Sequence, residues 1–259
     1  MSERLQFNWS GWLSFAGVLL LWELAARGAS GLRTYLPPIS QVLVALFACV
    51  STGQVLSHLA ITVVRFAESY LLAAAIGVTL GIVLGYSRLL HDLLEMPIEF
   101  LRPMPSVAIV PVAILMLGIG DSMIVAVTVY ATLWPVLTNT IDGVNQIESV
   151  LIHTGRTFGI GQLRLLRQVI LPAAAPYVVT GLRIGLSIAL ILVTTAEMLA
   201  GSKGLGFFIL DEERSMNSAN MYAGILLVAA LGYTFNRLFL ILEAKMIKRR
   251  RGASARQAA

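Results

Sequence analysis

The chain has 259 residues, of which 57% are hydrophobic and 13% are charged. A soluble domain is about 25% charged, so this composition indicates a membrane protein and excludes a soluble domain of any size. The net charge is +5, but the densest basic cluster directly follows the last apolar segment, which is typical of a cytoplasmic flank rather than of a nucleic-acid-binding surface. The single cysteine excludes an internal disulfide, and the three scattered histidines lack metal-ligand spacing.

The first apolar run, from Trp12 to Ala26, has two interpretations. It is either an uncleaved first span or the hydrophobic region of a signal peptide, with small residues for cleavage at 25–29. We favour the span, because everything downstream is also apolar enough for the membrane. Residues 27–57 then predict an external loop, which contains a moderately amphipathic helix from Ile39 to Val50.

A second span is expected from Leu59 to Gly85. Arg65 and Glu68 lie three residues apart within it, on one helix face, and they are expected to pair. Glycines at four-residue spacing form a small-residue ridge that allows another helix to approach closely: Gly77, Gly81 and Gly85. This ridge predicts a helix–helix contact along the span.

The middle of the chain holds the third and fourth spans. Residues 88–99 are expected to form a polar-flanked turn of chain on the inner side, followed by the helix-breaking stretch Leu101-Arg-Pro-Met-Pro105 and a helix over 107–117. The fourth span is expected over 124–141.

The last two spans are expected over 177–199 and 222–242, with an external loop at 201–220 and a basic cytoplasmic tail at 244–259. This gives about six transmembrane helices with both termini in the cytoplasm. The charge bias supports the orientation, because eleven Lys and Arg residues fall on the inner segments and four on the outer ones. The inner residues are Arg4, Arg88, Arg156, Arg164, Arg167, Lys245, Lys248, Arg249, Arg250, Arg251 and Arg256, and the outer residues are Arg27, Arg33, Lys203 and Arg214.

A polar segment, residues 143–172, separates the fourth and fifth spans. One helix is expected to run up to Phe158, the glycines at 159 and 161 allow the chain to bend, and a second helix is expected over 162–171. Pro172 can then open the next helix. The segment has internal structure and no obvious catalytic group, so we interpret it as a docking element for another protein.

This segment resembles the cytoplasmic loop of permease subunits of binding-protein-dependent ATP-binding-cassette importers. That loop reads Glu-Ala-Ala, three variable residues, Gly, about nine variable residues, then Ile-x-Leu-Pro. The chain has Gly159 and then Val169-Ile170-Leu171-Pro172 at matching spacing, while His153-Thr154-Gly155 stands in place of Glu-Ala-Ala. Four further motifs resemble the branch that serves sulfonates, taurine, nitrate and bicarbonate: Leu36-Pro37-Pro38, Leu101-Arg102-Pro103-Met104-Pro105, Leu117-Gly118-Ile119-Gly120 and Gly204-Leu205-Gly206.

The resemblance implies an all-α type I importer permease, a single transmembrane domain over residues 1–259 in the inner membrane. It implies a homodimer of this chain, two cytoplasmic ATPase subunits and an external solute-binding protein, with membrane lipid around them. No enzymatic activity and no cofactor of this chain are expected, because ATP would be bound and hydrolysed by the partner. The glycine-rich stretch at 201–206 lacks the spacing of a phosphate-binding loop and is interpreted as a re-entrant or gating loop.

By this resemblance the polar segment, residues 143–172, is a cytoplasmic coupling loop, and its residues are expected to fill a groove on the ATPase. Phe158, Leu163 and Leu166 are the expected apolar anchors, and three arginines form the polar rim or, alternatively, face lipid headgroups. The complete set of predicted docking residues is Gly155, Arg156, Phe158, Gly159, Gly161, Leu163, Arg164, Leu166, Arg167 and Pro172.

Charged groups inside spans cost roughly 2.5–3.5 kcal/mol by insertion scales, so each requires a partner or a wet cavity. Glu197 is expected either to line the translocation path or its outer gate, or to pair with an arginine at 65, 102 or 183. Arg102 is expected either to attract an anionic solute or to cap carbonyls that the double-proline break frees. The candidate path or gate residues are Arg102, Trp134, Thr138, Asn139, Ser187, Thr194 and Glu197.

The alternative function is a self-sufficient secondary transporter or channel. That class requires a coupling-ion site and usually an inverted repeat. We find no internal repeat in the sequence, and the polar segment would have no role. An intramembrane enzyme is excluded, because neither a His-Glu-x-x-His nor a Gly-x-Ser-x-Gly motif is present. The sequence favours an importer of a small anion, such as a sulfonate, taurine or nitrate.

Overall fold

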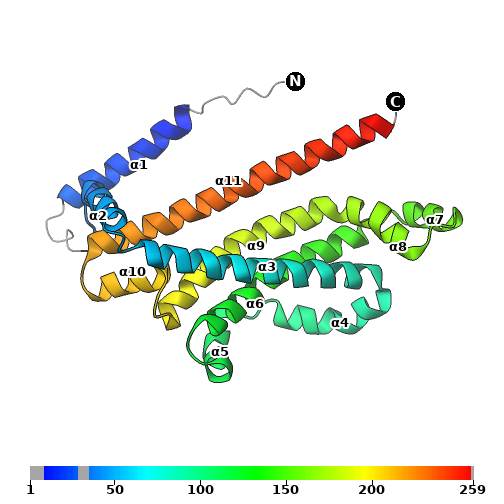
Figure 1. The fold of residues 1–259 in the computed structure, drawn as a ribbon, viewed down its shortest axis with the longest axis horizontal. Coiled ribbons are helices and arrows are strands. Elements are labelled where there is room, and N and C mark those ends of the chain that lie inside the picture. The colour runs from blue at the N-terminus through cyan, green and yellow to red at the C-terminus, as the bar shows by residue number, and fades with distance from the viewer. Residues whose placement is uncertain (1–8, 29–34, 258–259) are drawn as a thin grey trace.

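The computed structural model describes residues 9–28 and 35–257, and these residues form helices and no strands (Figure 1). Arg4 and Arg33, which contribute to the charge bias, lie outside the described residues. The α-helices are α1 (Trp9–Gly28), α2 (Ile39–Ser51), α3 (Leu56–Tyr86), α4 (Arg88–Leu101), α5 (Val110–Leu117), α6 (Asp121–Asn145), α7 (Ser149–Thr157), α8 (Gln162–Leu165), α9 (Leu171–Ala200), α10 (Leu205–Arg214) and α11 (Ser218–Gln257). A 3-10 helix, η1 (Ser106–Ile109), precedes α5, and a π-helical segment, η2 (Leu166–Ile170), joins α8 to α9.

Five helices of the described chain are long and apolar enough to cross a membrane: α1, α3, α6, the continuous helix Gln162–Ala200 and α11. A sixth span results if α4 and the pair η1–α5 are counted as one broken span. The two parts meet at an angle of 89° at the predicted break. The prediction of about six transmembrane helices is therefore confirmed.

Helix α4 corrects the prediction of a turn at residues 88–99. Its charged residues repeat at helical spacing and leave a continuous apolar face, which favours a helix over a turn. The hydroxyl of Ser87 caps it by accepting a hydrogen bond from the Leu90 N–H at 3.4 Å. None of its residues is buried within the chain.

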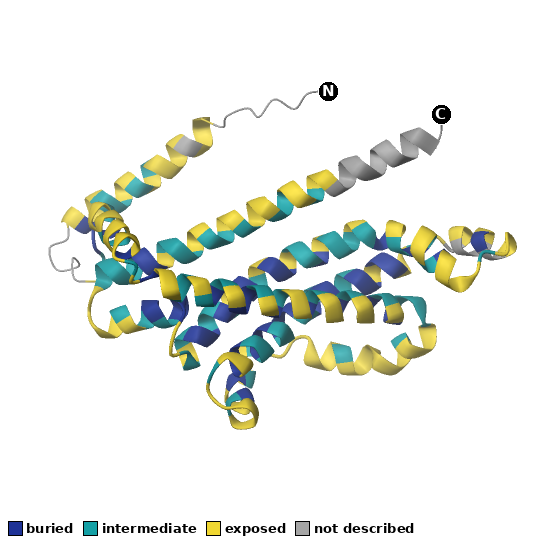
Figure 2. Ribbon diagram, viewed as in Figure 1, coloured by how far each residue is buried: buried dark blue, intermediate teal, exposed yellow. Residues whose placement is uncertain are grey.

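The core lies where α3 and α9 pack against α6. Half of the apolar window of α6 is buried, whereas none of the corresponding window of α11 is buried. Figure 2 shows the buried residues along α6, α9 and the adjoining face of α3, while α1 is mostly exposed and α11 is a mixture of exposed and intermediate residues. Exposed apolar helices of this kind suit a lipid environment.

The glycine ridge of α3 faces α6 as predicted. A Cβ atom on Gly81 would lie 2.5 Å from the Cβ of Thr140, and one on Gly77 would lie 2.9 Å from the Cβ of Val136. On the opposite side of α6, Gly185 of α9 approaches Val136 as closely, since its Cβ would lie 3.0 Å from Cγ2. Two small-residue faces thus hold α6 between them, which fixes the three-helix core.

Three further expectations are corrected by the fold. The second helix of the polar segment does not stand apart, because α8, η2 and α9 form one continuous helix. Pro172 is the second residue of α9 and directly follows the π-helical segment η2, so it lies inside the continuous helix and does not open a separate helix as predicted. The outer loop at 201–220 contains a helix, α10, rather than irregular chain.

Candidate functional site

The polar segment forms a compact knob at one end of the molecule, and α10 lies at the opposite end (Figure 1). Helix α7 ends at Thr157, and Gly159 in the turn that follows has a φ of +69°, in the left-handed region that suits glycine. The Ile160 N–H donates to the Gly155 carbonyl at 3.0 Å and closes the end of α7. The chain then reverses into α8, as the glycine spacing predicted.

A buried residue, Leu165, joins the two arms of this knob. Its side chain is 1% exposed and packs in a cluster with Val144, Ile170 and Ala174. A Cβ atom on Gly155 would lie 2.6 Å from Cδ1 of Leu165, so glycine at this position allows α8 to lie against α7. The sequence analysis missed Leu165, although it is an apolar residue within a stretch rich in arginine.

The predicted docking residues differ in exposure. Phe158 and Leu163 are 79% and 63% exposed, which leaves two large apolar side chains on the knob without cover. Leu166 differs from the prediction, because it is half-buried and packs against the Leu165 cluster. The side chain of Arg156 lies outside the described part of the structure.

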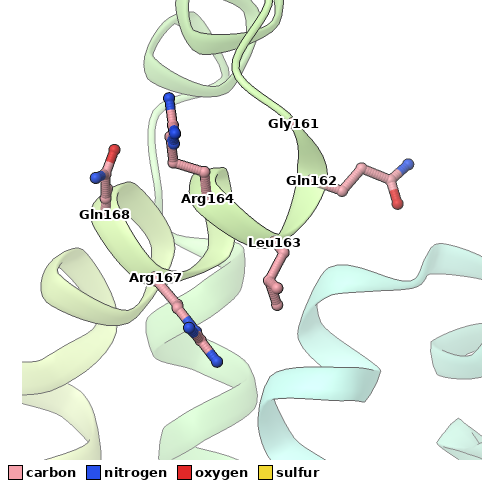
Figure 3. Close-up of a pocket in the computed structure, with 6 residues that line it drawn as sticks. All are labelled: Gly161, Gln162, Leu163, Arg164, Arg167 and Gln168. Atoms are coloured by element: carbon pink, nitrogen blue, oxygen red, sulfur yellow. The ribbon is translucent and has the colours of Figure 1, made fainter.

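A surface hollow of about 600 Å³ lies on the knob, and Figure 3 shows the six residues around it. Leu163 and Arg167 project to one side of the segment, while Arg164 projects to the other. The two exposed arginines therefore do not form one rim. The lining residues are Gly161, Gln162, Leu163, Arg164, Arg167 and Gln168.

At the opposite end, Glu197 is fully buried in a polar network. Its carboxylate accepts hydrogen bonds from Arg65 Nη1 at 2.9 Å, from the Thr62 hydroxyl at 2.9 and 3.0 Å, and from the Gly206 N–H at 3.0 Å. Arg65 also donates to the carboxylate of Asp121, with its Nε at 3.0 Å. A buried ion pair is tolerated only when such further hydrogen bonds satisfy both partners.

This geometry corrects the predicted pairing of Arg65 with Glu68. Arg65 turns toward α6 and α9 instead, where two carboxylates meet it, and Glu68 is exposed. Of the two interpretations of Glu197, the arginine pairing is present, with the arginine at position 65 as the partner. A role of Glu197 in the path or gate stays a prediction.

The glycine-rich loop between α9 and α10 is built around Glu197. Gly204 has a φ of +113°, and a Cβ atom there would meet the carboxylate, so only glycine fits. His58 Nδ1 lies 3.1 Å from both the nitrogen and the oxygen of Gly204, and the imidazole stacks on Phe207. The network thus joins α3, α6, α9 and α10, and we call it the outer clamp, after the external side on which the sequence predicts the 201–220 loop.

The other candidate path residues fall into two separate hollows. One, of about 540 Å³, lies between η1, α6 and α9. The second, of about 710 Å³, lies between α9 and α11 and includes Arg183, whose guanidinium pairs with Glu243. Arg102, Trp134, Thr138 and Asn139 line the first hollow, and Ser187 and Thr194 line the second.

Residues 77–248 match the family described as the binding-protein-dependent transport system inner membrane component. The chain belongs to this family. It is 27% identical over 246 residues to the putative aliphatic sulfonates transport permease protein SsuC of Bacillus subtilis, covering 95% of this chain and 89% of that protein. It is 30% identical over 183 residues to the nitrate import permease protein NrtB of Synechocystis, covering 71% and 66%.

A chain of the MetNI methionine ABC transporter, solved in an inward-facing conformation, has a similar fold. Its TM-score is 0.61 at 19% identity, with 73% of this chain and 92% of that chain covered. The protein is thus a permease subunit of an ABC importer, a multi-span inner-membrane component that works with ATPase subunits and a binding protein. The family is a transport family, and the permease is not itself catalytic.

Proposed function

We propose that this permease imports a small organic or inorganic anion of the sulfonate, taurine or nitrate class. Two copies would form the path, two ATPase subunits would bind and hydrolyse ATP, and an external binding protein would deliver the solute. The names of the relatives support the substrate class. The exposed Phe158 and Leu163 on the glycine-closed knob carry the proposal, because they offer a partner two uncovered apolar anchors.

The coupling mechanism follows from the continuous helix Gln162–Ala200. A push on α8 passes directly into α9, since no break separates them and Leu165 holds the knob against the core. The same helix carries Glu197 of the outer clamp in its last turn and ends at Ala200. ATPase closure at the knob would therefore shift the helix that anchors the outer loop, as alternating access requires.

The knob, residues 143–172, would lie in the cytoplasm with both termini. The basic tail, residues 244–259, includes the C-terminal part of α11, which runs to Gln257, and its cations would contact anionic lipid at the inner membrane surface. The side chain of Lys245 is exposed, and the side chains that follow it lie outside the described part of the structure.

The proposal predicts that transport requires the ATPase subunit. The permease should co-elute with that subunit, and proteoliposomes should take up the anion only with the ATPase, the binding protein and hydrolysable ATP together. A catalytically inactive ATPase, which still assembles, is the matched control and should abolish uptake. Uptake that persists without any ATPase would refute the proposal and favour a secondary carrier.

A further inference from the structure

Arg102 carries an unpaired charge at the break between α4 and η1. Among the described residues, neither a hydrogen bond nor an ion pair involves its guanidinium, although it lines the hollow of about 540 Å³. A charge near membrane depth requires a partner or water. The guanidinium of Arg102 is therefore free to bind a ligand inside the hollow.

The structure does not use Arg102 to cap the carbonyls that the proline break frees. The carbonyl of Leu101 accepts the Tyr130 hydroxyl at 2.7 Å and the Met104 N–H at 3.2 Å instead. Tyr130 thus fills the capping role that was one of the two expectations for Arg102. Of the two expectations for Arg102, the attraction of an anionic solute is the one that remains.

A second donor stands in the wall of the same hollow. Trp134 is 9% exposed, and its indole N–H is buried without an acceptor among the described residues. Its ring is held by an edge-to-face contact with Tyr130, at 5.4 Å between centroids. A buried donor without a partner is destabilising, so an acceptor that enters the hollow would be favoured there.

The remaining lining adds polar groups and no negative charge. Asn139 donates one amide N–H to the Pro135 carbonyl at 2.8 Å, which leaves its second N–H free to donate. Ser106 contributes a hydroxyl, whereas the Thr138 hydroxyl already donates to the Trp134 carbonyl at 2.9 Å. Among the described residues, no carboxylate lines the hollow. A guanidinium with several neutral donors suits a ligand that has acceptor oxygens only.

We propose that this hollow is an oxoanion-binding subsite, with Arg102 holding the anionic head of the solute and Trp134 and Asn139 orienting it. The inference rests on the proposed function, because the bound head would be that of the imported sulfonate, nitrate or carboxylate. A lipid phosphate has the same chemistry, so the test must separate the two sources.

The test uses the permease assembled with its ATPase subunits in a maltoside detergent, which contains no phosphate. Trp9, Trp12 and Trp22 are replaced by Phe, so that Trp134 is the remaining tryptophan of the permease, and the signal of the ATPase subunits alone is subtracted. Nitrate and methanesulfonate are titrated against chloride at constant ionic strength. We expect a saturable change in Trp134 fluorescence whose midpoint rises about tenfold or more in Arg102→Gln and less in Arg102→Lys.

The matched control is Arg88→Gln, at the start of the same helix and outside the hollow, and its midpoint should equal that of the parent. Co-elution with the ATPase verifies the fold of each variant. An unchanged midpoint in Arg102→Gln, or no saturable signal, would overturn the subsite. A response that requires added phosphatidylglycerol would also overturn it and assign the hollow to a lipid headgroup. ATP-dependent uptake is measured on the same preparations, so a failure of the proposed function is seen separately.

Discussion

Replacement of both Phe158 and Leu163 by Asp is expected to abolish ATP-driven uptake while the permease still folds and inserts. Both side chains are mostly exposed, so the change removes no packing within the chain. Apolar anchors at the centre of an interface each contribute about 2 kcal/mol or more, so the affinity for the ATPase should fall by roughly a hundredfold or more. Co-elution and uptake measure this loss, and thermal unfolding in detergent verifies the fold.

The matched control is Met216→Asp, which makes the same chemical change at an exposed apolar residue at the α10 end. It should leave ATPase binding unchanged. Leu165→Ala should behave differently from the Phe158 and Leu163 double variant. It removes a buried side chain from the centre of the knob, so it should lower thermal stability as well as coupling. Full uptake by the Phe158 and Leu163 double variant would rule out the knob as the coupling element.

Arg65→Ala is expected to destabilise the permease by about 3–5 kcal/mol, because it leaves the buried Glu197 carboxylate without its cation. Glu197→Gln should destabilise it in the same direction, since Arg65 would lose its buried carboxylate and keep Asp121 and the Lys203 carbonyl as acceptors. The double variant Arg65→Met, Glu197→Met should lose less than the two single variants together. Unfolding followed in detergent, by heat or denaturant, measures these differences.

Glu68→Ala is the control for the outer clamp, because Glu68 lies on the same helix, is exposed and does not pair with Arg65. Its effect should be close to zero. The Glu197→Gln protein that remains folded should still transport if the carboxylate is structural. Unchanged stability together with lost transport would show instead that Glu197 acts in the path.

The coupling loop was predictable because its signals are local. Gly159 has a φ of +69°, which its residue type favours, and it closes the turn as expected. Gly161 has an extended φ of −61° that any residue adopts, so its type does not determine its conformation. The glycine ridge of α3 was predictable for the same reason, since small residues at four-residue spacing lie on one face of any helix. The partner of that ridge, α6, was not predictable from the spacing.

The outer clamp was predicted only in part, because its partners are far apart in the sequence and Arg65 was one of three arginines expected as alternatives for Glu197. Arg65 and Glu197 are separated by 132 positions, whereas Glu68 is one turn away and seemed the natural partner. Burial decided the outcome, because Glu197 has no access to water and requires a cation, while Glu68 is exposed. Leu165 was missed because only the fold shows which leucine of the knob faces inward.

Site-directed cross-linking at the knob tests the central claim most directly. The native Cys49 is 3% exposed and burial raises the pKa of its thiol, so Cys49→Ala gives a cysteine-free background at little risk. A cysteine at Leu163 should then cross-link to the ATPase subunit, and the yield should change between the ATP-bound and nucleotide-free states. Labelling of that cysteine from the external side, or no cross-link to an ATPase in the assembled transporter, would contradict the account.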